Sequence, residues 1–209
     1  MLFSAEELQA YLNKHTVTGI IHVGAHLCEE MDYYKNFLAL TDSEILWVDG
    51  NKYLVEQCKY KYPSSSVFYG VCSHKAGQTV TFNITNNGQS SSILPLGTHK
   101  QHHPWVWNVQ SQTHITTTVD QLLTENNIPH DVANMMNIDV QGAELLVLKG
   151  SPKVLENIKY IFTEVNEEYV YENCALITEL DDFLGKLGFE RVLTNMTEHK
   201  WGDALYVKK

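Results

Sequence analysis

The chain has 209 residues and a formal net charge of −10, and 44% of its residues are hydrophobic. A chain of this length buries enough apolar surface for one domain, so we expect a single domain over residues 1–209. Because phosphate binding requires a cationic surface, the acidic balance and the single arginine, Arg191, argue against nucleic acids as partners and favour an uncharged ligand.

No segment predicts a membrane partner or a secretory route. The longest apolar runs, residues 45–48 and 145–148, are far shorter than a membrane span, and no charged-then-apolar leader opens the chain. The four cysteines lack CxxC spacing, which favours reduced thiols over a zinc site or a redox pair. We therefore expect a cytoplasmic protein, whose oligomeric state the sequence leaves open.

The first third of the sequence alternates between helical and strand patterns. Ser4 and Glu7 form a capping box for an amphipathic helix within residues 1–15. Apolar runs and helical spacing then predict strands at residues 16–23, 44–49 and 67–72, with helices at residues 28–40 and 52–62.

The alternation breaks after residue 72. Residues 79–84 alternate like an edge or hairpin strand, and residues 85–113 are polar, rich in serine and histidine, and interrupted by Pro95 and Pro104. A long irregular stretch within a domain is typical of a functional loop. We therefore expect residues 85–113 to cover a binding site.

The last part of the chain returns to alternation and ends on two consecutive strands. We expect strands at residues 114–118, 135–140, 160–165, 189–193 and 204–207, and helices at residues 119–126, 143–150 and 176–187. Alternating strands and helices predict an α/β fold with a mostly parallel sheet, helices on both faces and a C-terminal antiparallel hairpin.

Three strand ends carry residues suited to binding chemistry. Gly24 follows the first strand, Asp49 ends the second, and Asp139 lies at the end of the strand over residues 135–140. In open α/β sheets, ligands bind beyond the carboxyl ends of the strands. Each acid has a plainer interpretation as a helix cap, but three such junctions in one chain favour a shared site.

The segment Ile-Asp-Val-Gln-Gly-Ala-Glu-Leu-Leu-Val-Leu-Lys-Gly, residues 138–150, resembles the signature of the FkbM family of S-adenosylmethionine-dependent O-methyltransferases. Val23-Gly24-Ala25-His26 and the two glutamates that follow resemble the cofactor loop of that family, and residues 163–165 and 202–207 match it more weakly. The resemblance implies a Rossmann-like class I methyltransferase core with a seven-stranded sheet, S-adenosylmethionine as cofactor, and transfer of a methyl group to a hydroxyl of a sugar or glycoconjugate. Residues 85–113 would then form the acceptor loop.

The glycine pattern separates this cofactor loop from a dinucleotide site. A pyrophosphate needs bare backbone at the helix start, but the places of the second and third glycines hold His26 and Glu29. We therefore expect Asp49, with Asn51 beside it, to bind the ribose hydroxyls, and Gly24 to let the backbone approach the cofactor. A nicotinamide-dependent oxidoreductase is correspondingly disfavoured.

The family resemblance adds further cofactor-binding residues. It implies that Cys72 and Ser73 border the adenine and that His22, Ala25 and His26 belong to the cofactor loop. His22 stands where the family has Asp, and Cys28 stands where it has a second glycine. Glu30, or alternatively Glu29, could replace the missing acid, although both glutamates are also explained by a favourable interaction with a helix N-terminus.

Methyl transfer to a hydroxyl requires a group that removes the proton. Asp139 is the leading candidate for base or acceptor-orienting group and also borders the cofactor, and Glu164 is the next acid along the same edge. His102 is a further candidate, with His99 and His103 in the same loop. Glu144 is interpreted either as a direct participant or as a supporting acid at the start of a helix.

Two alternatives remain open at this point. The acids at the ends of two strands could hold a divalent ion that lowers the pKa of the acceptor, although we favour no metal. The chain could also be a non-catalytic domain that binds cofactor or glycan on a methyltransferase core.

Overall fold

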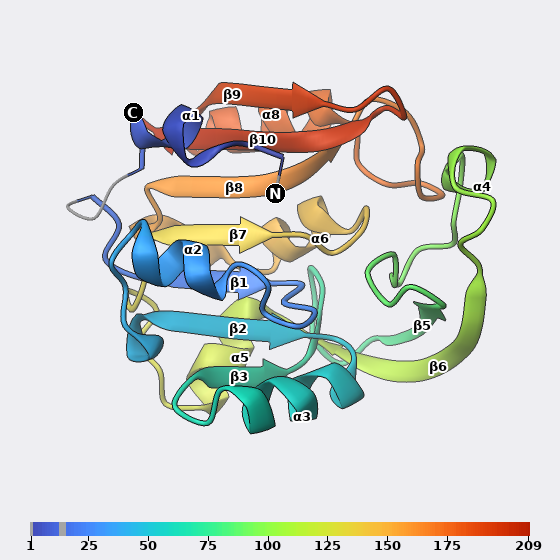
Figure 1. The fold of residues 1–209 in the computed structure, drawn as a ribbon, viewed down its shortest axis with the longest axis horizontal. Helices are drawn as coiled ribbons and strands as arrows, with labels where there is room; N and C mark the ends of the chain where they lie inside the picture. The colour runs from blue at the N-terminus through green and yellow to red at the C-terminus, as the bar shows by residue number, and fades with distance from the viewer. Residues whose placement is uncertain (1, 13–15) are drawn as a thin grey trace.

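A seven-stranded sheet in the order β3-β2-β1-β7-β8-β10-β9 organises the computed structural model, which describes residues 2–12 and 16–209 (Figure 1). Its strands are β1 Ile20–Val23, β2 Ile45–Asp49, β3 Ser66–Tyr69, β7 Met135–Ile138, β8 Tyr160–Asn166, β9 Phe189–Met196 and β10 Trp201–Lys208. The strands from β3 to β8 pair in parallel, and β10 runs antiparallel to both β8 and β9. The predicted parallel sheet with a C-terminal antiparallel hairpin is confirmed.

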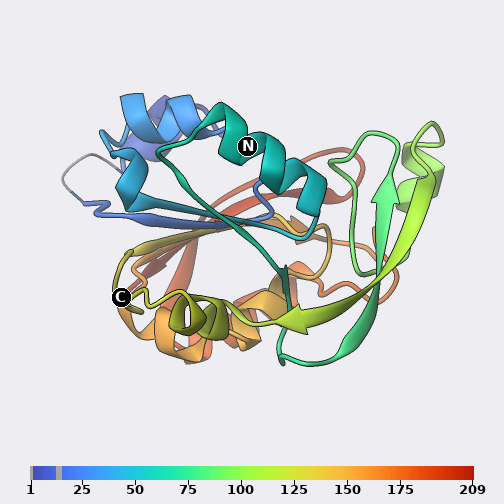
Figure 2. The same ribbon diagram turned by 90° about the horizontal axis from the view of Figure 1, so that it is seen from below.

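Helices cover both faces of this sheet (Figure 2). One face carries α1 Ala5–Gln9, α2 Met31–Asn36 and α3 Lys52–Lys61, and the other carries α5 Val119–Glu125, α6 Glu144–Lys149, α7 Pro152–Asn157 and α8 Ile177–Lys186. Each face has its own apolar core: Leu8, Tyr34 and Val55 pack on the first, and Leu122, Val147 and Leu184 on the second. Because β1 and β7 are central and covered on both sides, every residue of both strands is buried.

Two of the helices on the first face, α1 and α2, are shorter than predicted, whereas α3 matches the predicted helix over residues 52–62 to within one residue. The capping box of α1 forms as expected, since the amide of Ser4 donates to Glu7 Oε2 at 2.8 Å and Ser4 Oγ accepts from the amide of Glu7. The helix then ends at Gln9, and residues 13–15 of the predicted segment lie outside the described residues. In place of a helix from residue 28, a tight turn precedes α2, with Cys28 at a φ of 57°.

A smaller sheet stands beside the main one; the predicted strands at residues 79–84 and 114–118 are confirmed, but their pairing in a separate sheet was not predicted. It contains β4 Val71–Cys72, β6 Asn108–Thr117 and β5 Thr79–Thr85, in that order. The predicted strand over residues 67–72 is therefore divided at Gly70, because residues 71–72 leave the main sheet and pair with β6. Residues 108–113 were expected within an irregular loop; they instead pair with β5, whose ladder satisfies their backbone polar groups.

The helix α7 also escaped prediction. It begins with Pro152, and its first amides, those of Lys153 and Val154, donate to the carboxylate of Asp120 at 2.9 and 3.1 Å. Asp120 lies on α5, so the cap comes from a residue more than thirty positions away.

The connection between β5 and β6, residues 86–107, includes the short helix α4 His99–His102. None of the helices in the described ranges is both long and apolar enough to cross a membrane.

Candidate active site

Two adjoining cavities open at the carboxyl ends of the central parallel strands. The larger has a volume of about 440 Å³ and lies beyond β1, β7 and β8. The smaller lies beyond β1 and β2, between Asp49 and Cys72. Five residues line both cavities and mark the junction between them: Gly24, His26, Gln89, Asp139 and Gln141.

The main chain after β1 lies tightly against the main chain after β7 at Gly24. This residue has a φ of +95°, and a Cβ atom built on it would lie 1.7 Å from the carbonyl oxygen of Asp139. Any side chain would therefore collide with the backbone that carries Asp139, so glycine is required here. The close approach places bare backbone on the junction between the two cavities.

Asp49 lies at the end of β2 and shapes the smaller cavity. Its Oδ2 accepts from the amide of His26 at 2.8 Å, and its Oδ1 accepts from the amide of Asn51 at 2.6 Å. Burial raises the pKa of this carboxyl to about 6, although both amide hydrogen bonds favour the ionised form. Asn51 also lines this cavity, but its side-chain oxygen caps α3 by accepting from the amide of Tyr53.

His22 is a buried, neutral imidazole that lines the larger cavity. Asn137 Nδ2 donates to Tyr34 Oη at 2.6 Å, which leaves the Tyr34 hydroxyl to donate to His22 Nδ1 at 3.1 Å. Burial lowers the pKa of His22 to about 4. A neutral ring makes no strong ion pair with Glu30 at 3.9 Å, so His22 does not supply the charge of the Asp that the family has at this position.

The two glutamates of the cofactor loop have different surroundings. Glu29 pairs with His26 Nδ1 at 2.5 Å and accepts from the amide of Leu27, so it holds the loop itself. Glu30 lines the larger cavity, and burial raises the pKa of its carboxyl. Glu29 also lines the larger cavity but is already paired with His26, so Glu30 is the glutamate that is placed to meet a cationic group.

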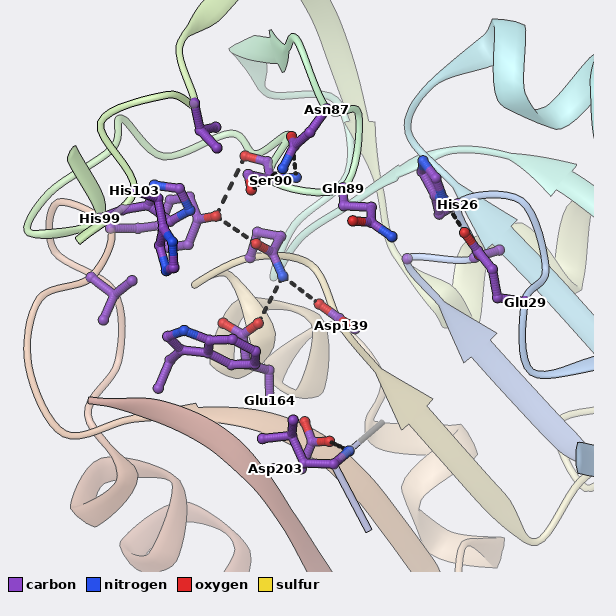
Figure 3. A pocket seen from close by; sticks show the side chains of 18 of the residues that line it. His26, Glu29, Asn87, Gln89, Ser90, His99, His103, Asp139, Glu164 and Asp203 are labelled. Carbon is purple, nitrogen blue, oxygen red and sulfur yellow. Dashed lines mark hydrogen bonds and ion pairs between the residues drawn. The ribbon is translucent and has the colours of Figure 1, made fainter. Parts of the chain in front are cut away.

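A hydrogen-bonded network centred on Gln141 lines the larger cavity, and its bonds to Asp139 and Glu164 are among the dashed lines in Figure 3. Gln141 Nε2 donates to Asp139 Oδ1 at 2.6 Å and to Glu164 Oε2 at 2.7 Å, and Gln141 Oε1 accepts from the hydroxyl of Tyr171 at 2.5 Å. Asp139 is exposed to solvent in the cavity. Desolvation by the surrounding protein nevertheless raises its pKa, although the hydrogen bond from Gln141 acts in the opposite direction. Burial and the negative charge of Asp139 raise the pKa of Glu164 well above its usual range.

Glu144 anchors the turn that carries this network. Its Oε1 accepts from the amides of Val140 and Gly142 at 3.1 and 3.0 Å, and the residue is only 1% exposed. Burial raises its pKa to about 7. Glu144 lines neither cavity, so the structure favours the supporting interpretation. Asp139 is not the cap of α6, because the N-cap residue of this helix is Ala143.

The β5–β6 loop, residues 86–107, covers the junction between the cavities. Ser92 Oγ donates to the carbonyl oxygen of Gln141 at 2.7 Å, and Gly88 packs against His26 so closely that an added Cβ would lie 3.0 Å from Nε2. Gln89 lines both cavities. The part of the predicted acceptor loop that remains irregular therefore contacts both the cofactor loop and the Asp139 turn.

A histidine cluster forms one wall of the larger cavity. His99 and His103 line it, whereas His102 does not; the ring of His102 lies 4.9 Å from that of His199. Burial lowers the pKa of His99 to about 4 and also lowers that of His103. Among the residues that the structure describes, no group of three or more His, Cys, Asp or Glu side chains is arranged to hold a metal ion.

Most of the residues selected from the sequence converge on these cavities. The larger is lined by His22, Gly24, Ala25, His26, Glu30, Asp139 and Glu164, and the smaller by Gly24, His26, Asp49, Asn51, Cys72 and Asp139. Ser73 and His102 are the exceptions. Ser73 lines neither cavity, because its amide pairs with Thr117 in the strand connection beside β4.

The lining residues that were not selected individually from the sequence include Gln89, Gln141, Tyr171 and Asp203. Gln141 and Asp203 lie within the two family-like segments, so those segments carried a signal for them. Tyr171 has no local signal, because it reaches the cavity only through the packing of residues 167–176 beside the β5–β6 loop.

The family model of the FkbM methyltransferase domain matches residues 22–191. This range includes the strand ends at Gly24, Asp49 and Asp139, and also Gln141 and Glu164. The chain belongs to the FkbM methyltransferase family. A comparison with curated protein sequences finds no match.

Solved structures of other methyltransferases are similar to this chain, although their sequence identities are low. An O-methyltransferase from Bacillus cereus in complex with S-adenosylhomocysteine is 9% identical, with a TM-score of 0.52, covering 98% of this chain and 80% of the other. A magnesium protoporphyrin IX methyltransferase from Synechocystis is 8% identical, with a TM-score of 0.49, covering 98% and 76%. A TehB-like methyltransferase from Corynebacterium glutamicum is 11% identical, with a TM-score of 0.46, covering 98% and 85%.

The protein is therefore an S-adenosylmethionine-dependent methyltransferase with a class I α/β fold. The cavities suit this cofactor chemically. Gly24 exposes backbone at the junction of the two cavities. The smaller cavity offers the Asp49 carboxylate to the ribose hydroxyls, and the carboxylates of the larger cavity suit the ammonium and sulfonium groups of the cofactor.

Proposed function

We propose that this methyltransferase transfers a methyl group to a hydroxyl oxygen of a sugar or glycoconjugate. The observation that carries the proposal is the junction at Asp139, where the smaller cavity meets the larger one. Asp49, Asn51 and Cys72 would hold the adenosine end of the cofactor in the smaller cavity. Glu30 would face its methionine end in the larger.

S-adenosylmethionine, when bound, supplies the electrophilic methyl group. The protein must then align the acceptor oxygen, remove its proton and exclude water. Asp139 is the proposed proton acceptor, because it lies at the junction of the two cavities and desolvation by the surrounding protein raises its pKa, which makes it a stronger base. Gln141 fixes the orientation of that carboxylate through its 2.6 Å hydrogen bond.

The lining of the larger cavity supports a sugar as acceptor. Polar side chains of Asn87, Gln89 and Ser90 enter it from the β5–β6 loop, and Trp105 and Trp201 add aromatic faces. Polar groups that bind hydroxyls, together with aromatic rings that pack on the apolar face of a sugar ring, are a common combination in carbohydrate sites. His99 and His103, rather than His102, are the loop histidines placed beside such an acceptor.

The extent of the domain and its location stay predictions. We propose that residues 1–209 form one methyltransferase domain, since strands from both ends of the chain share the main sheet. A cytoplasmic location and the absence of a nucleic-acid partner rest on the sequence alone.

Calorimetry with S-adenosylmethionine and S-adenosylhomocysteine tests the cofactor site. Asp49→Ala should weaken both by about 1.5–3 kcal/mol, because ribose hydroxyls lose a charged acceptor. Asp182→Ala, an exposed acid on α8, serves as the control and should bind like the original protein. Unchanged affinity in a folded Asp49→Ala protein would remove Asp49 from the site, and preferential binding of NAD would contradict the assignment of the cavity.

Labelled methyl transfer to a panel of sugars and glycoconjugates tests the acceptor class, with product analysis to locate the methyl group. We expect an O-methylated sugar. Preferential methylation of RNA, DNA or protein contradicts the proposal, and cofactor binding without turnover on any acceptor would favour a non-catalytic binding domain.

A further inference from the structure

The side-chain amide of Gln141 uses both of its ends in hydrogen bonds. Nε2 has two hydrogens, which go to Asp139 Oδ1 at 2.6 Å and to Glu164 Oε2 at 2.7 Å, and Oε1 accepts from the hydroxyl of Tyr171 at 2.5 Å. Turned end for end, the same amide would place an oxygen, which has no hydrogen to donate, against the carboxylate of Asp139. The orientation of Asp139 therefore depends on which end of the amide faces it.

Tyr171 supplies the donor that distinguishes the two ends of this amide. Its hydroxyl has a single hydrogen, and the carbonyl oxygen of Ser90, which also lies within reach, is farther away at 3.4 Å. The closer acceptor, Gln141 Oε1, therefore takes the hydrogen. Burial raises the pKa of Tyr171 well above its usual range, so the hydroxyl keeps its proton and remains a donor.

Packing fixes the position of the Tyr171 hydroxyl. Tyr171 is only 1% exposed, and a Cβ atom added to Gly142, the residue after Gln141, would lie 2.9 Å from the Cβ atom of Tyr171. The backbone of Tyr171 also forms an antiparallel bridge with Leu96 of the β5–β6 loop. Tyr171 is therefore held against both the turn that carries Gln141 and the loop that covers the site.

We propose that Tyr171 is a positioning residue for methyl transfer, because its hydroxyl holds the Gln141 amide with Nε2 toward Asp139. Tyr171 acts through Gln141, from which it is 30 positions distant in the sequence, and not on the acceptor itself. This inference rests on the proposed function, in which Asp139 accepts the proton of the acceptor hydroxyl. A purely structural role for Tyr171 predicts lost stability and no change at Asp139.

Carbon-13 NMR of the aspartate carboxyl groups in the free protein tests the orientation. Asp139→Asn identifies the signal of Asp139, and the pKa is then measured in the original protein and in Tyr171→Phe. Because the hydrogen bond from Gln141 favours the ionised carboxylate, its loss in Tyr171→Phe should raise the pKa of Asp139 by about half a unit to one unit. An unchanged pKa of Asp139 would overturn the proposal. The other titratable groups that act on Asp139 are common to both proteins and include His22, Glu30, Glu144, Glu164 and Asp203.

Tyr206→Phe is the matched control. Tyr206 is also 1% exposed, and its hydroxyl donates to Asp181 Oδ1 at 2.9 Å, but it lines neither cavity. Each substitution removes one buried hydroxyl, so both should lower the free energy of unfolding in urea denaturation, whereas only Tyr171→Phe should move the pKa of Asp139. An equal shift of that pKa in Tyr206→Phe would reveal a general response to lost stability and would contradict the proposal.

Turnover tests the catalytic consequence, with labelled S-adenosylmethionine and the sugar that the panel described above shows to be methylated. Tyr171→Phe should lower kcat by about tenfold, since one hydrogen bond of ordinary net strength corresponds to about that factor. The KM for the sugar and the affinity for S-adenosylhomocysteine should stay nearly unchanged. A change confined to KM, or an unchanged kcat, would contradict the positioning role.

A double-mutant cycle shows whether Tyr171 acts through Gln141. In the Gln141→Asn protein the amide is withdrawn by one methylene group and no longer joins Tyr171 to Asp139, so adding Tyr171→Phe should lower kcat little further. Equal losses of kcat from Tyr171→Phe in the original and Gln141→Asn proteins would overturn the proposal.

The failures of this proposal and of the proposed function are distinguishable. If Asp139→Asn keeps full turnover, the role of Asp139 in the proposed function fails. If Asp139→Asn is inactive but Tyr171→Phe keeps the original kcat and the original pKa of Asp139, only the role of Tyr171 fails. If no sugar in the panel is methylated, the acceptor class fails, and the carboxyl titration alone decides whether Tyr171 orients the amide.

Discussion

Gln141 Nε2 donates a hydrogen bond of 2.6 Å to Asp139 Oδ1, so the side chain two positions along the turn orients the acid at the end of β7. Gln141 itself has a φ of +58°, a conformation in which asparagine is one of the better tolerated side chains. Gln141→Asn is therefore a mild test: it shortens the side chain without forcing a strained backbone.

We expect Gln141→Asn to lower kcat by about tenfold to a hundredfold, because Asp139 and Glu164 lose a shared donor worth about 1.5–3 kcal/mol. Affinity for S-adenosylmethionine should change little. Single-turnover kinetics and calorimetry on the same preparation measure the two quantities. A fall in donor affinity as large as the fall in kcat would show that Gln141 supports the cofactor site instead.

The proton-accepting role of Asp139 predicts a second result. Asp139→Asn keeps the shape and removes the base, so turnover should fall by about a hundredfold or more while donor binding is nearly kept. Activity is measured with a confirmed acceptor, with and without a chelator. Full turnover in the variant excludes the base role, and loss of activity with chelator that a divalent ion restores would replace it with metal assistance.

Glu144 predicts an effect on folding. In Glu144→Ala the buried amides of Val140 and Gly142 lose their acceptor, and we expect the free energy of unfolding to fall by about 1–3 kcal/mol. Glu144→Gln keeps an oxygen at the same position and should lose clearly less. Urea denaturation compares the two variants, and equal losses would show that charge rather than hydrogen bonding matters at this position.

Asp49 makes donor binding pH-dependent. Burial raises its pKa to about 6, so its carboxylate is present above that pH and is lost as the pH falls through it. The Kd for S-adenosylmethionine should therefore rise below about pH 6, by at most about tenfold per pH unit for one proton. Asp49→Asn should bind more weakly at pH 7.5 and lose this pH step. An identical pH profile in the variant would assign the step to another group.

The β5–β6 loop predicts a response to the acceptor. Trp105 lies on this loop, lines the larger cavity and is 63% exposed. Trp105→Ala should raise the KM for the acceptor and leave donor affinity unchanged. Limited proteolysis of residues 86–107 should slow when donor and acceptor are both present, because closure of the loop excludes water from the site. Protection by donor alone would indicate that the loop serves the cofactor.

Much of the fold followed from local pattern. Apolar runs located the strands of the main sheet, and the residues at their ends, Gly24, Asp49 and Asp139, are those that line the cavities. The reason is general: parallel strands point their carboxyl ends to one edge, so residues at successive strand ends meet there wherever the helices lie. The turn chemistry at residues 138–150 also placed Glu144 at the start of α6.

Tertiary structure decided what depends on partners distant in sequence. Ser73 leaves the site because residues 71–73 pair beside β6, and α7 forms with a cap from Asp120 on another helix. The network that joins Asp139, Gln141, Glu164 and Tyr171 draws on three separate segments, and no periodicity in the sequence encodes that meeting. The sequence alone determined the fold class and the positions of the acids, whereas packing determined which donors surround each acid and therefore its charge and orientation.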